Sequence, residues 1–218
     1  QGSSLCRFIF PNLSDVDCKG TENNSPYAKF NDNNKLKRAI DFCLRYKNSN
    51  APVTPSGIKD GLEMLGGNVA TNFKPMNAKA LYERYTPKNG VIFDYACGFG
   101  GRMLGALSSN NDYIYYGCEP NTETFKNLNE LGSMIEKVTK RNKSFAIKCI
   151  GSEDLNFKRK EFVDFAFSSP PYFTLEKYCN EETQSYIKFN TLEKWLSGYV
   201  KPTIQNIYNM LKSGRYYA

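Results

Sequence analysis

Residues 91–102 have the sequence VIFDYACGFGGR, which is the clearest indication of the fold in this chain. The mostly apolar run Val91–Tyr95 is typical of a short buried strand, while the glycines of Gly98–Gly101 permit positive φ and a close approach of the backbone to a ligand. A helix that starts at Arg102 would then offer free backbone N–H groups to that ligand. The order of strand, glycine-rich turn and helix predicts a binding site at the end of the strand.

Strand and helix patterns alternate on both sides of this stretch. The further elements that the sequence predicts are a helix over 78–85 capped by Asn77, strands over 113–118, 144–150 and 162–167, a helix capped by Asn121 or Thr122, and a helix over 192–211. This alternation predicts an α/β fold with a doubly wound, mostly parallel sheet. Such a sheet binds its ligands at the carboxyl ends of the strands.

The two ends of the chain are expected to differ from this core. One amphipathic helix near residues 34–44 is followed by a breaker stretch, so residues 1–51 are predicted to form a small helical N-terminal appendage and residues 52–218 the main domain. Gln1–Ser4 resemble the remnant of a cleaved tag. Gly214–Ala218 look like the start of a fifth strand, and we therefore expect the chain to be truncated at its C-terminus.

Composition excludes several kinds of chemistry. The 218 residues include no histidine, which removes Ser-His-Asp and Cys-His catalysis and His-ligated zinc. None of the seven cysteines lies in a C-x-x-C pair, so we predict no metal site and a reduced, cytoplasmic protein. No segment approaches the roughly 18 apolar residues of a membrane span. The net charge of +7 permits an anionic partner, although the basic clusters at 137–143 and 158–160 are interpreted first as solvated edges.

An acidic residue, Glu119, follows the next predicted strand. A carboxylate at this point can accept both hydroxyls of a ribose, so the turn and the acid together predict a cofactor that contains a nucleoside. The run Gly98–Gly101 departs from the G-x-G-x-x-G pattern of dinucleotide sites, and Asp94 would repel a pyrophosphate but suits the ammonium of a methionine-like group. The pattern therefore favours S-adenosylmethionine.

The second chemical motif is Ser169-Pro170-Pro171-Tyr172, directly after the strand predicted at 162–167. Two prolines fix φ twice and remove two donors, so the Ser169 hydroxyl and the Pro170 carbonyl can be held rigidly as acceptors. An exocyclic amino group needs two such acceptors to aim its lone pair at a sulfonium methyl, and Tyr172 can stack on a flat base. The structural alternative is a strand-ending turn with an exposed tyrosine.

Together the two motifs resemble those of the S-adenosylmethionine-dependent amino-methyltransferases of DNA, over about residues 70–215. Asp94–Arg102 is similar to motif I and Ser169–Tyr172 to motif IV, in the Ser-Pro-Pro-Tyr form found most often in cytosine-N4 enzymes and in some adenine-N6 enzymes. The resemblance implies a Rossmann-like class I methyltransferase fold and direct methyl transfer to a flipped base of double-stranded DNA, with RNA as another partner. It also implies that the catalytic residues are Ser169, Pro170, Pro171 and Tyr172.

The resemblance further assigns a set of cofactor-binding residues. These are Phe73, Pro75, Asp94, Gly98, Gly100, Gly101, Glu119, Pro120, Ser152 and Glu153. Asp94 and the glycines would hold the methionine end, and Glu119 the ribose. Pro120 would pack on the adenine, with Ser152 and Glu153, in a stretch similar to motif III, at the adenine edge. Phe73 and Pro75, in a stretch similar to motif X, would close over the cofactor's carboxylate.

Other functions stay open at this point. The Pro-Pro-Tyr motif is shared with RNA-base and protein-glutamine N-methyltransferases. The glycine-rich turn alone is compatible with a NAD-type oxidoreductase. In the resembling enzymes with this motif order, target recognition follows the catalytic motifs, and the sequence holds no such region, so a non-catalytic cofactor-binding module is a further alternative.

Overall fold

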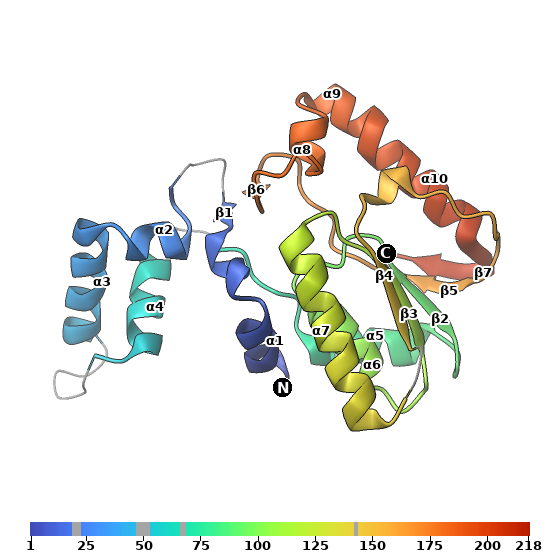
Figure 1. Ribbon diagram of the computed structural model, residues 1–218, viewed down its shortest axis with the longest axis horizontal. Helices are drawn as coiled ribbons and strands as arrows, with labels where there is room; N and C mark the ends of the chain where they lie inside the picture. The colour runs from blue at the N-terminus through green and yellow to red at the C-terminus, as the bar shows by residue number, and fades with distance from the viewer. Residues whose placement is uncertain (19–22, 47–52, 66–68, 142–143) are drawn as a thin grey trace. The chain divides into compact units, whose positions relative to one another are not determined.

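The computed structural model describes residues 1–18, 23–46, 53–65, 69–141 and 144–218 (Figure 1). The chain forms two compact units. The larger unit comprises residues 1–11, 72–173 and 180–218, and the smaller unit comprises residues 12–71 and 174–179. Within the described ranges, no helix combines the length and the hydropathy that crossing a bilayer requires. All the site residues predicted from the sequence lie in the larger unit.

The larger unit is built on a five-stranded parallel sheet with the order β4-β3-β2-β5-β7. Its strands are β2 (Val91–Asp94), β3 (Ile114–Cys118), β4 (Phe145–Lys148), β5 (Val163–Ala166) and β7 (Leu211–Tyr217). The chain runs from β2 outward to β4, crosses back over β2, and continues through β5 to β7. This is the 3-2-1-4-5 order of a Rossmann-type sheet. The predicted doubly wound α/β fold is confirmed, and so is the fifth strand.

The helices of the larger unit precede or connect these strands. They are α1 (Ser3–Ile9), α5 (Pro75–Tyr85), α6 (Gly101–Leu107), α7 (Thr122–Thr139), α8 (Ser185–Lys188), α9 (Leu192–Trp195) and α10 (Lys201–Met210), with a 3-10 turn at Ser152–Asp154. Asn121 caps α7 as predicted, because its side-chain oxygen accepts the N–H of Thr124. Helix α5 begins earlier than predicted, at Pro75 with Lys74 as the N-cap instead of Asn77, because proline suits the first helical position.

The helix predicted over 192–211 contains an irregularity. A π-helical turn, Leu196–Val200, joins α9 to α10. Pro202 follows in the first turn of α10. Because proline lacks an N–H and its ring crowds the carbonyl of the preceding turn, a wider turn relieves the conflict. The apolar periodicity of the sequence continues through this segment and gives no sign of the change.

Alternate residues of the strands pack into two separate hydrophobic cores, one on each face of the sheet. Ile92 and Phe165 are partners in register and share one face, where the ring of Tyr82 from α5 lies 6.1 Å from that of Phe165. Phe93 points to the other face and clusters with Ile207 and Met210 of α10. Figure 1 shows α7 on one side of the strands and α10 on the other. The period of two therefore places Asp94, two residues after Ile92, on the face covered by α5, α6 and α7.

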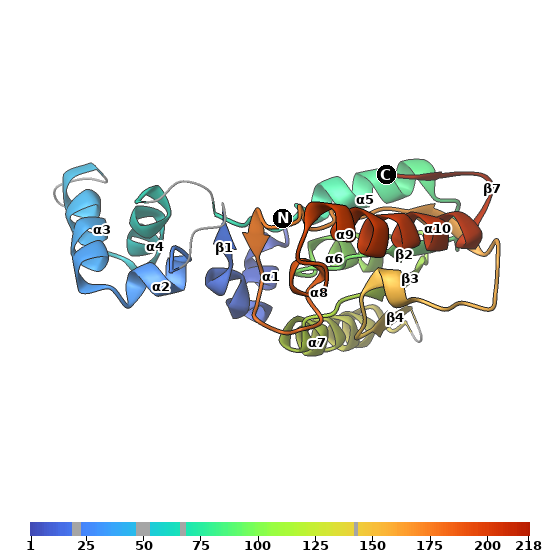
Figure 2. The same cartoon turned by 90° about the horizontal axis from the view of Figure 1, so that it is seen from above.

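The smaller unit contains a helical hairpin and a short antiparallel pair of strands. Its elements are α2 (Pro26–Phe30), α3 (Asn33–Tyr46), α4 (Pro55–Met64), β1 (Asp17–Cys18) and β6 (Glu176–Lys177). Figure 2 shows α3 and α4 side by side. They can pack closely because Gly61 has no side chain: a Cβ at this position would come within 2.7 Å of the Ala39 carbonyl oxygen.

The structure divides the chain differently from the predicted 1–51 appendage and 52–218 domain. The predicted junction lies outside the described residues, and the helices on either side of it, α3 and α4, belong to one unit. Residues 1–11 belong instead to the sheet-containing unit, where Phe10 packs edge-on against Phe99. The first passage from one unit to the other falls in the 3-10 turn Pro11–Asp15. Ser3 and Ser4, predicted as part of a tag remnant, begin α1.

Candidate functional site

The glycine-rich turn leaves β2 in the left-handed conformation that its sequence predicts. Gly98 has φ 56° and Gly100 has φ 74°, and Gly100 is the N-cap of α6. A Cβ on Gly101 would lie 2.0 Å from the carbonyl oxygen of Phe73. A Cβ on Gly98 would meet only the Arg102 Nη2 atom, at 4.0 Å, so there is open space beside this glycine. The turn is therefore packed tightly on one side and open on the other.

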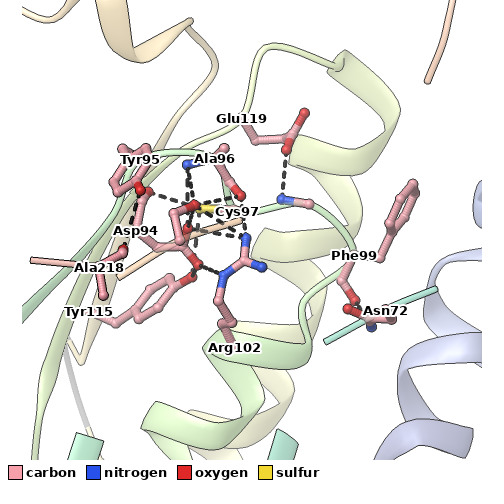
Figure 3. Close-up of polar contacts among 12 residues, drawn as sticks. Asn72, Asp94, Tyr95, Ala96, Cys97, Phe99, Arg102, Tyr115, Glu119 and Ala218 are labelled. Carbon is pink, nitrogen blue, oxygen red and sulfur yellow. Dashed lines mark hydrogen bonds and ion pairs between the residues drawn. The ribbon is translucent and has the colours of Figure 1, made fainter. Parts of the chain in front are cut away.

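The segment similar to motif X lies across this turn. The Asn72 Nδ2 atom donates to the Phe99 carbonyl oxygen at 2.6 Å (Figure 3). The Phe73 ring packs edge-on against Phe167, with ring centroids 5.4 Å apart. The Pro75 carbonyl oxygen lies where a Cβ on Gly105 would approach within 2.5 Å. The structure thus places the backbone of Phe73 against the turn and Pro75 against α6, which follows the turn.

Asp94 is fully buried and surrounded by donors (Figure 3). Its Oδ2 atom accepts from Arg102 Nε at 2.7 Å and from the Tyr115 hydroxyl at 2.5 Å. Its Oδ1 atom accepts from the Ser168 hydroxyl at 2.6 Å, from Arg102 Nη2 at 3.2 Å and from the Ala96 N–H at 3.3 Å. A carboxylate has about four lone-pair positions. These donors occupy all of them, which gives Asp94 different partners from the ammonium that the sequence predicted.

Arg102 supplies the positive charge that balances Asp94. Its side chain is 6% exposed, and Nη2 also donates to the Ala96 carbonyl. Burial lowers the pKa of the guanidinium, but the charge of Asp94 and the hydrogen bonds to it raise that pKa further than burial lowers it. The guanidinium of Arg102 is therefore the counter-charge of the buried Asp94 carboxylate. Because Arg102 balances the charge of Asp94, that charge does not discriminate between S-adenosylmethionine and a dinucleotide, which corrects the preference predicted from the sequence.

Glu119 follows β3 and holds the turn through the backbone. Its Oε2 atom accepts from the Gly98 N–H at 2.8 Å, and its Oε1 atom accepts from the Asn121 N–H at 3.0 Å. Burial raises the pKa of this carboxyl to about 7, against the opposing effect of the two N–H groups. Each oxygen keeps a second lone pair for a further donor. The neighbouring Pro120 is half-buried, and its carbonyl accepts from the Thr183 hydroxyl at 3.1 Å.

Ser152 and Glu153 follow β4 and differ in what they offer a ligand. The Ser152 hydroxyl is buried against that of Thr203, 2.9 Å away. The Glu153 side chain is 3% exposed, and its Oε1 atom accepts from Lys188 Nζ at 3.0 Å. Its Oε2 atom is buried and has no hydrogen-bond partner among the described residues. A buried carboxylate oxygen without a donor is costly, so this atom is a natural acceptor for a ligand.

The Ser169–Tyr172 motif follows β5 at the same edge of the sheet. Ser169 is exposed, the two prolines are half-buried, and Tyr172 is 56% exposed. Ser168, directly before them, is buried, and its hydroxyl accepts from the Ala96 N–H at 3.0 Å while donating to Asp94. Because β5 and β2 are adjacent and parallel, the motif and the turn leave the sheet side by side where the strand order reverses. The predicted acceptor and cofactor motifs are thus brought together.

Sequence reasoning missed three members of this arrangement, namely Arg102, Tyr115 and Ser168. A signal existed for Arg102, which lies eight residues after Asp94 at the start of a helix that packs on the same face. Tyr115 stands opposite Ile92 in register, so it shares the face of Asp94. Nothing in the sequence distinguishes Ser168 from Ser169 as the buried member of the pair.

The two basic clusters lie away from this edge. Of the cluster predicted at 137–143, residues 142 and 143 lie outside the described residues, and residues 137–141 end α7 and lead toward β4. Residues 158–160 lead into β5, so the described parts of both clusters are at the amino ends of strands. Lys137, Lys140 and Arg141 line a shallow hollow together with Ser133 and Glu136. Arg141 donates a hydrogen bond to the Tyr113 carbonyl at 2.7 Å and forms an ion pair with Asp112. These clusters therefore do not line the site.

No family model matches the chain, and no curated protein matches it. Among solved structures it is similar to geranyl diphosphate C-methyltransferase from Streptomyces coelicolor A3(2), in complex with Mg²⁺, geranyl-S-thiolodiphosphate and S-adenosyl-L-homocysteine. The identity is 13%, the TM-score is 0.47, and the match covers 78% of this chain and 49% of that one. It is also similar to Haemonchus contortus phosphoethanolamine N-methyltransferase 2 in complex with S-adenosyl-L-methionine, at 16% identity and a TM-score of 0.45, covering 82% and 34%.

The matched part of the chain thus spans half of the length of these two proteins or less. At such identities and TM-scores the similarity says nothing of cofactor or substrate. Only the residues of this chain can support a function.

The packing of the turn makes a stability prediction. Gly101→Ala should lower the free energy of unfolding by about 3 kcal/mol or more, because its Cβ would overlap the backbone of Phe73. Gly98→Ala, in the same turn, should lose only the roughly 1–2 kcal/mol of a left-handed alanine, since its Cβ meets open space. Urea denaturation of the two variants measures the difference. Equal losses would show that the segment at Phe73 does not lie across the turn.

Proposed function

We propose that this protein is an S-adenosylmethionine-dependent methyltransferase that acts on an exocyclic amino nitrogen of a base in DNA, with cytosine N4 preferred to adenine N6. The observation that carries the proposal is that Ser169-Pro170-Pro171-Tyr172 leaves β5 directly beside the glycine-rich turn that leaves β2. A turn that cradles a cofactor and a rigid pair of acceptors for an amino group are thereby neighbours. The NAD-type alternative leaves the second motif without a purpose.

The residues present fit the nucleoside part of this cofactor. Glu119 has a free lone pair on each oxygen for the two ribose hydroxyls and lies against the turn through Gly98. The unpartnered Oε2 atom of Glu153 suits the amino group of an adenine. The open space beside Gly98 and the free N–H groups at the start of α6 suit the remainder. Asp94 is the exception, because its acceptors are already used.

When bound, the cofactor supplies an electrophilic methyl group on a sulfonium. The chain's part is to present the amino nitrogen to it. The Ser169 hydroxyl and the Pro170 carbonyl would each accept a hydrogen bond from the amino group. The exposed Tyr172 ring would stack on the flipped base. The nitrogen would gain the methyl as the bond between that methyl and the sulfonium sulfur breaks, leaving a neutral thioether, and it would lose one proton to solvent. Orientation alone supplies effective molarities of about 10⁵ M or more, so a chain without histidine needs no strong base.

DNA as the partner rests on the resemblance of the two motifs and on the net charge of +7. Transfer of a tritiated methyl group to DNA, RNA and protein under identical conditions separates DNA from the RNA-base and protein-glutamine alternatives. Nucleoside mass spectrometry of the methylated DNA then distinguishes N4-methylcytosine from N6-methyladenine. Methyl transfer to RNA alone, to protein alone, or to no polymer would contradict the proposal.

Turnover should depend on the residues of the acceptor motif. Tyr172→Ala should lower kcat/KM for DNA by about 10–100-fold, because base stacking contributes roughly 1–3 kcal/mol. Ser169→Ala should lower kcat by about 10-fold, through the loss of one acceptor. Neither should change the cofactor affinity measured by calorimetry. Tyr208→Ala is the matched control, since Tyr208 is 76% exposed on α10. Unchanged turnover in Tyr172→Ala would refute the stacking role.

The protonation of Glu119 should make cofactor affinity depend on pH. Only the ionised carboxylate can accept from both ribose hydroxyls, and its pKa is about 7. Cofactor affinity should therefore rise with pH up to about 7, by as much as tenfold per pH unit, and level off above it. Glu119→Gln should bind more weakly and lose this dependence. The variant also corrects for the cofactor's own amino group, which titrates near 7.7–8.0. An affinity that is equally pH-dependent in both proteins would assign the effect elsewhere.

A further inference from the structure

We propose that Asp94, Arg102, Tyr115 and Ser168 form a positioning network that sets the acceptor motif in register with the cofactor turn. Asp94 would thus act through its neighbours and not on the cofactor's ammonium. The inference rests on the proposed function for its catalytic consequence, but the network itself consists of contacts within the chain. Figure 3 shows the carboxylate of Asp94 at its centre.

Four elements meet in this network. Asp94 ends β2, Tyr115 lies in β3, Arg102 lies in the first turn of α6, and Ser168 follows β5. Each of the other three side chains donates to the same carboxylate, at 2.5–2.7 Å for its shortest bond. The carboxyl ends of β2 and β5, the second residue of β3 and the start of α6 are therefore tied to a single buried point.

Arg102 makes this point rigid. Its Nε and Nη2 atoms form a two-pronged contact with the two oxygens of Asp94, a geometry that a planar guanidinium fixes and an ammonium does not. Nη2 also contacts the Ala96 carbonyl and the Ser168 hydroxyl, the latter at 3.4 Å. If either partner of a buried pair is removed, the other charge is left uncompensated. Asp94 and Arg102 are thus a unit that tolerates the loss of both better than the loss of one.

Ser168 transmits this position to the acceptor motif. Its hydroxyl donates to Asp94 and accepts from the Ala96 N–H, so it is bonded to the residues that begin the cofactor turn. The next residue is Ser169, followed by two prolines whose φ angles are fixed. No freely rotating residue other than Ser169 separates the anchor from the Pro170 carbonyl. The distance between the acceptors and the turn is therefore set at Ser168.

The test is a kinetic cycle on the two serines. Ser168→Ala should leave cofactor affinity within about twofold and lower kcat about 10-fold with little change in KM, because the acceptors are displaced but the cofactor turn is intact. Since Ser168 acts through Ser169, the double variant Ser168→Ala/Ser169→Ala should lose much less than the product of the single losses. The control is Ser197→Ala, an exposed serine on the α9–α10 helix. Normal turnover in Ser168→Ala, or fully multiplicative losses, would overturn the proposal.

A second measurement separates failure of this inference from failure of the proposed function. If the wild-type chain takes up no S-adenosylmethionine in calorimetry, the function is wrong, and the network is then judged by thermal unfolding. Arg102→Met should lower Tm by roughly 10 °C or prevent folding, because it leaves the buried carboxylate of Asp94 without its counter-charge. Asp94→Asn/Arg102→Met should recover most of that loss. A double variant that is no more stable than Arg102→Met, or that does not fold, would contradict the network.

Discussion

The buried ion pair between Asp94 and Arg102 lies where the carboxyl ends of β2 and β5 meet the first turn of α6, and the geometry of the site depends on it. A charge at this depth is stable only with a matched counter-charge and a full set of hydrogen bonds, and Asp94 has both. The pair therefore constrains the backbone around it. The turn that follows β2 and the loop that follows β5 are held to one point, whichever ligand occupies the space beyond.

The two halves of the candidate site are consequently built in different ways. The half for which we propose a cofactor is mainly backbone: left-handed glycines, the start of α6, and Glu119, which accepts a hydrogen bond from the N–H of Gly98. The acceptor half is a short stretch of Ser169 and two prolines, stiff in itself but attached to the sheet through Ser168. A reaction that relies on orientation and not on a proton shuttle needs such a fixed relation between two bound groups. The absence of histidine from the sequence is compatible with that reaction.

Much of this could be predicted from the sequence because it depends on local chemistry. Only glycine adopts the φ of Gly98 and Gly100 readily, asparagine is a strong helix cap, and apolar strands alternate visibly with helices. The partner of Asp94 could not be predicted, because it depends on how α6 approaches β2 in three dimensions. The burial of Ser168 instead of Ser169 could not be predicted either, because it depends on the path of the chain after β5. Nor could the pairing of α3 with α4, where Ala39 contacts Gly61.

A crystal structure of the chain with bound S-adenosylhomocysteine would show which groups contact Asp94 when the site is occupied. We expect that Arg102 still contacts both oxygens of Asp94, that the ribose hydroxyls lie on Glu119, and that the amino group of the homocysteine is bound by groups other than Asp94. A complex in which Arg102 has left Asp94 and the cofactor's ammonium has replaced it would contradict the central claim.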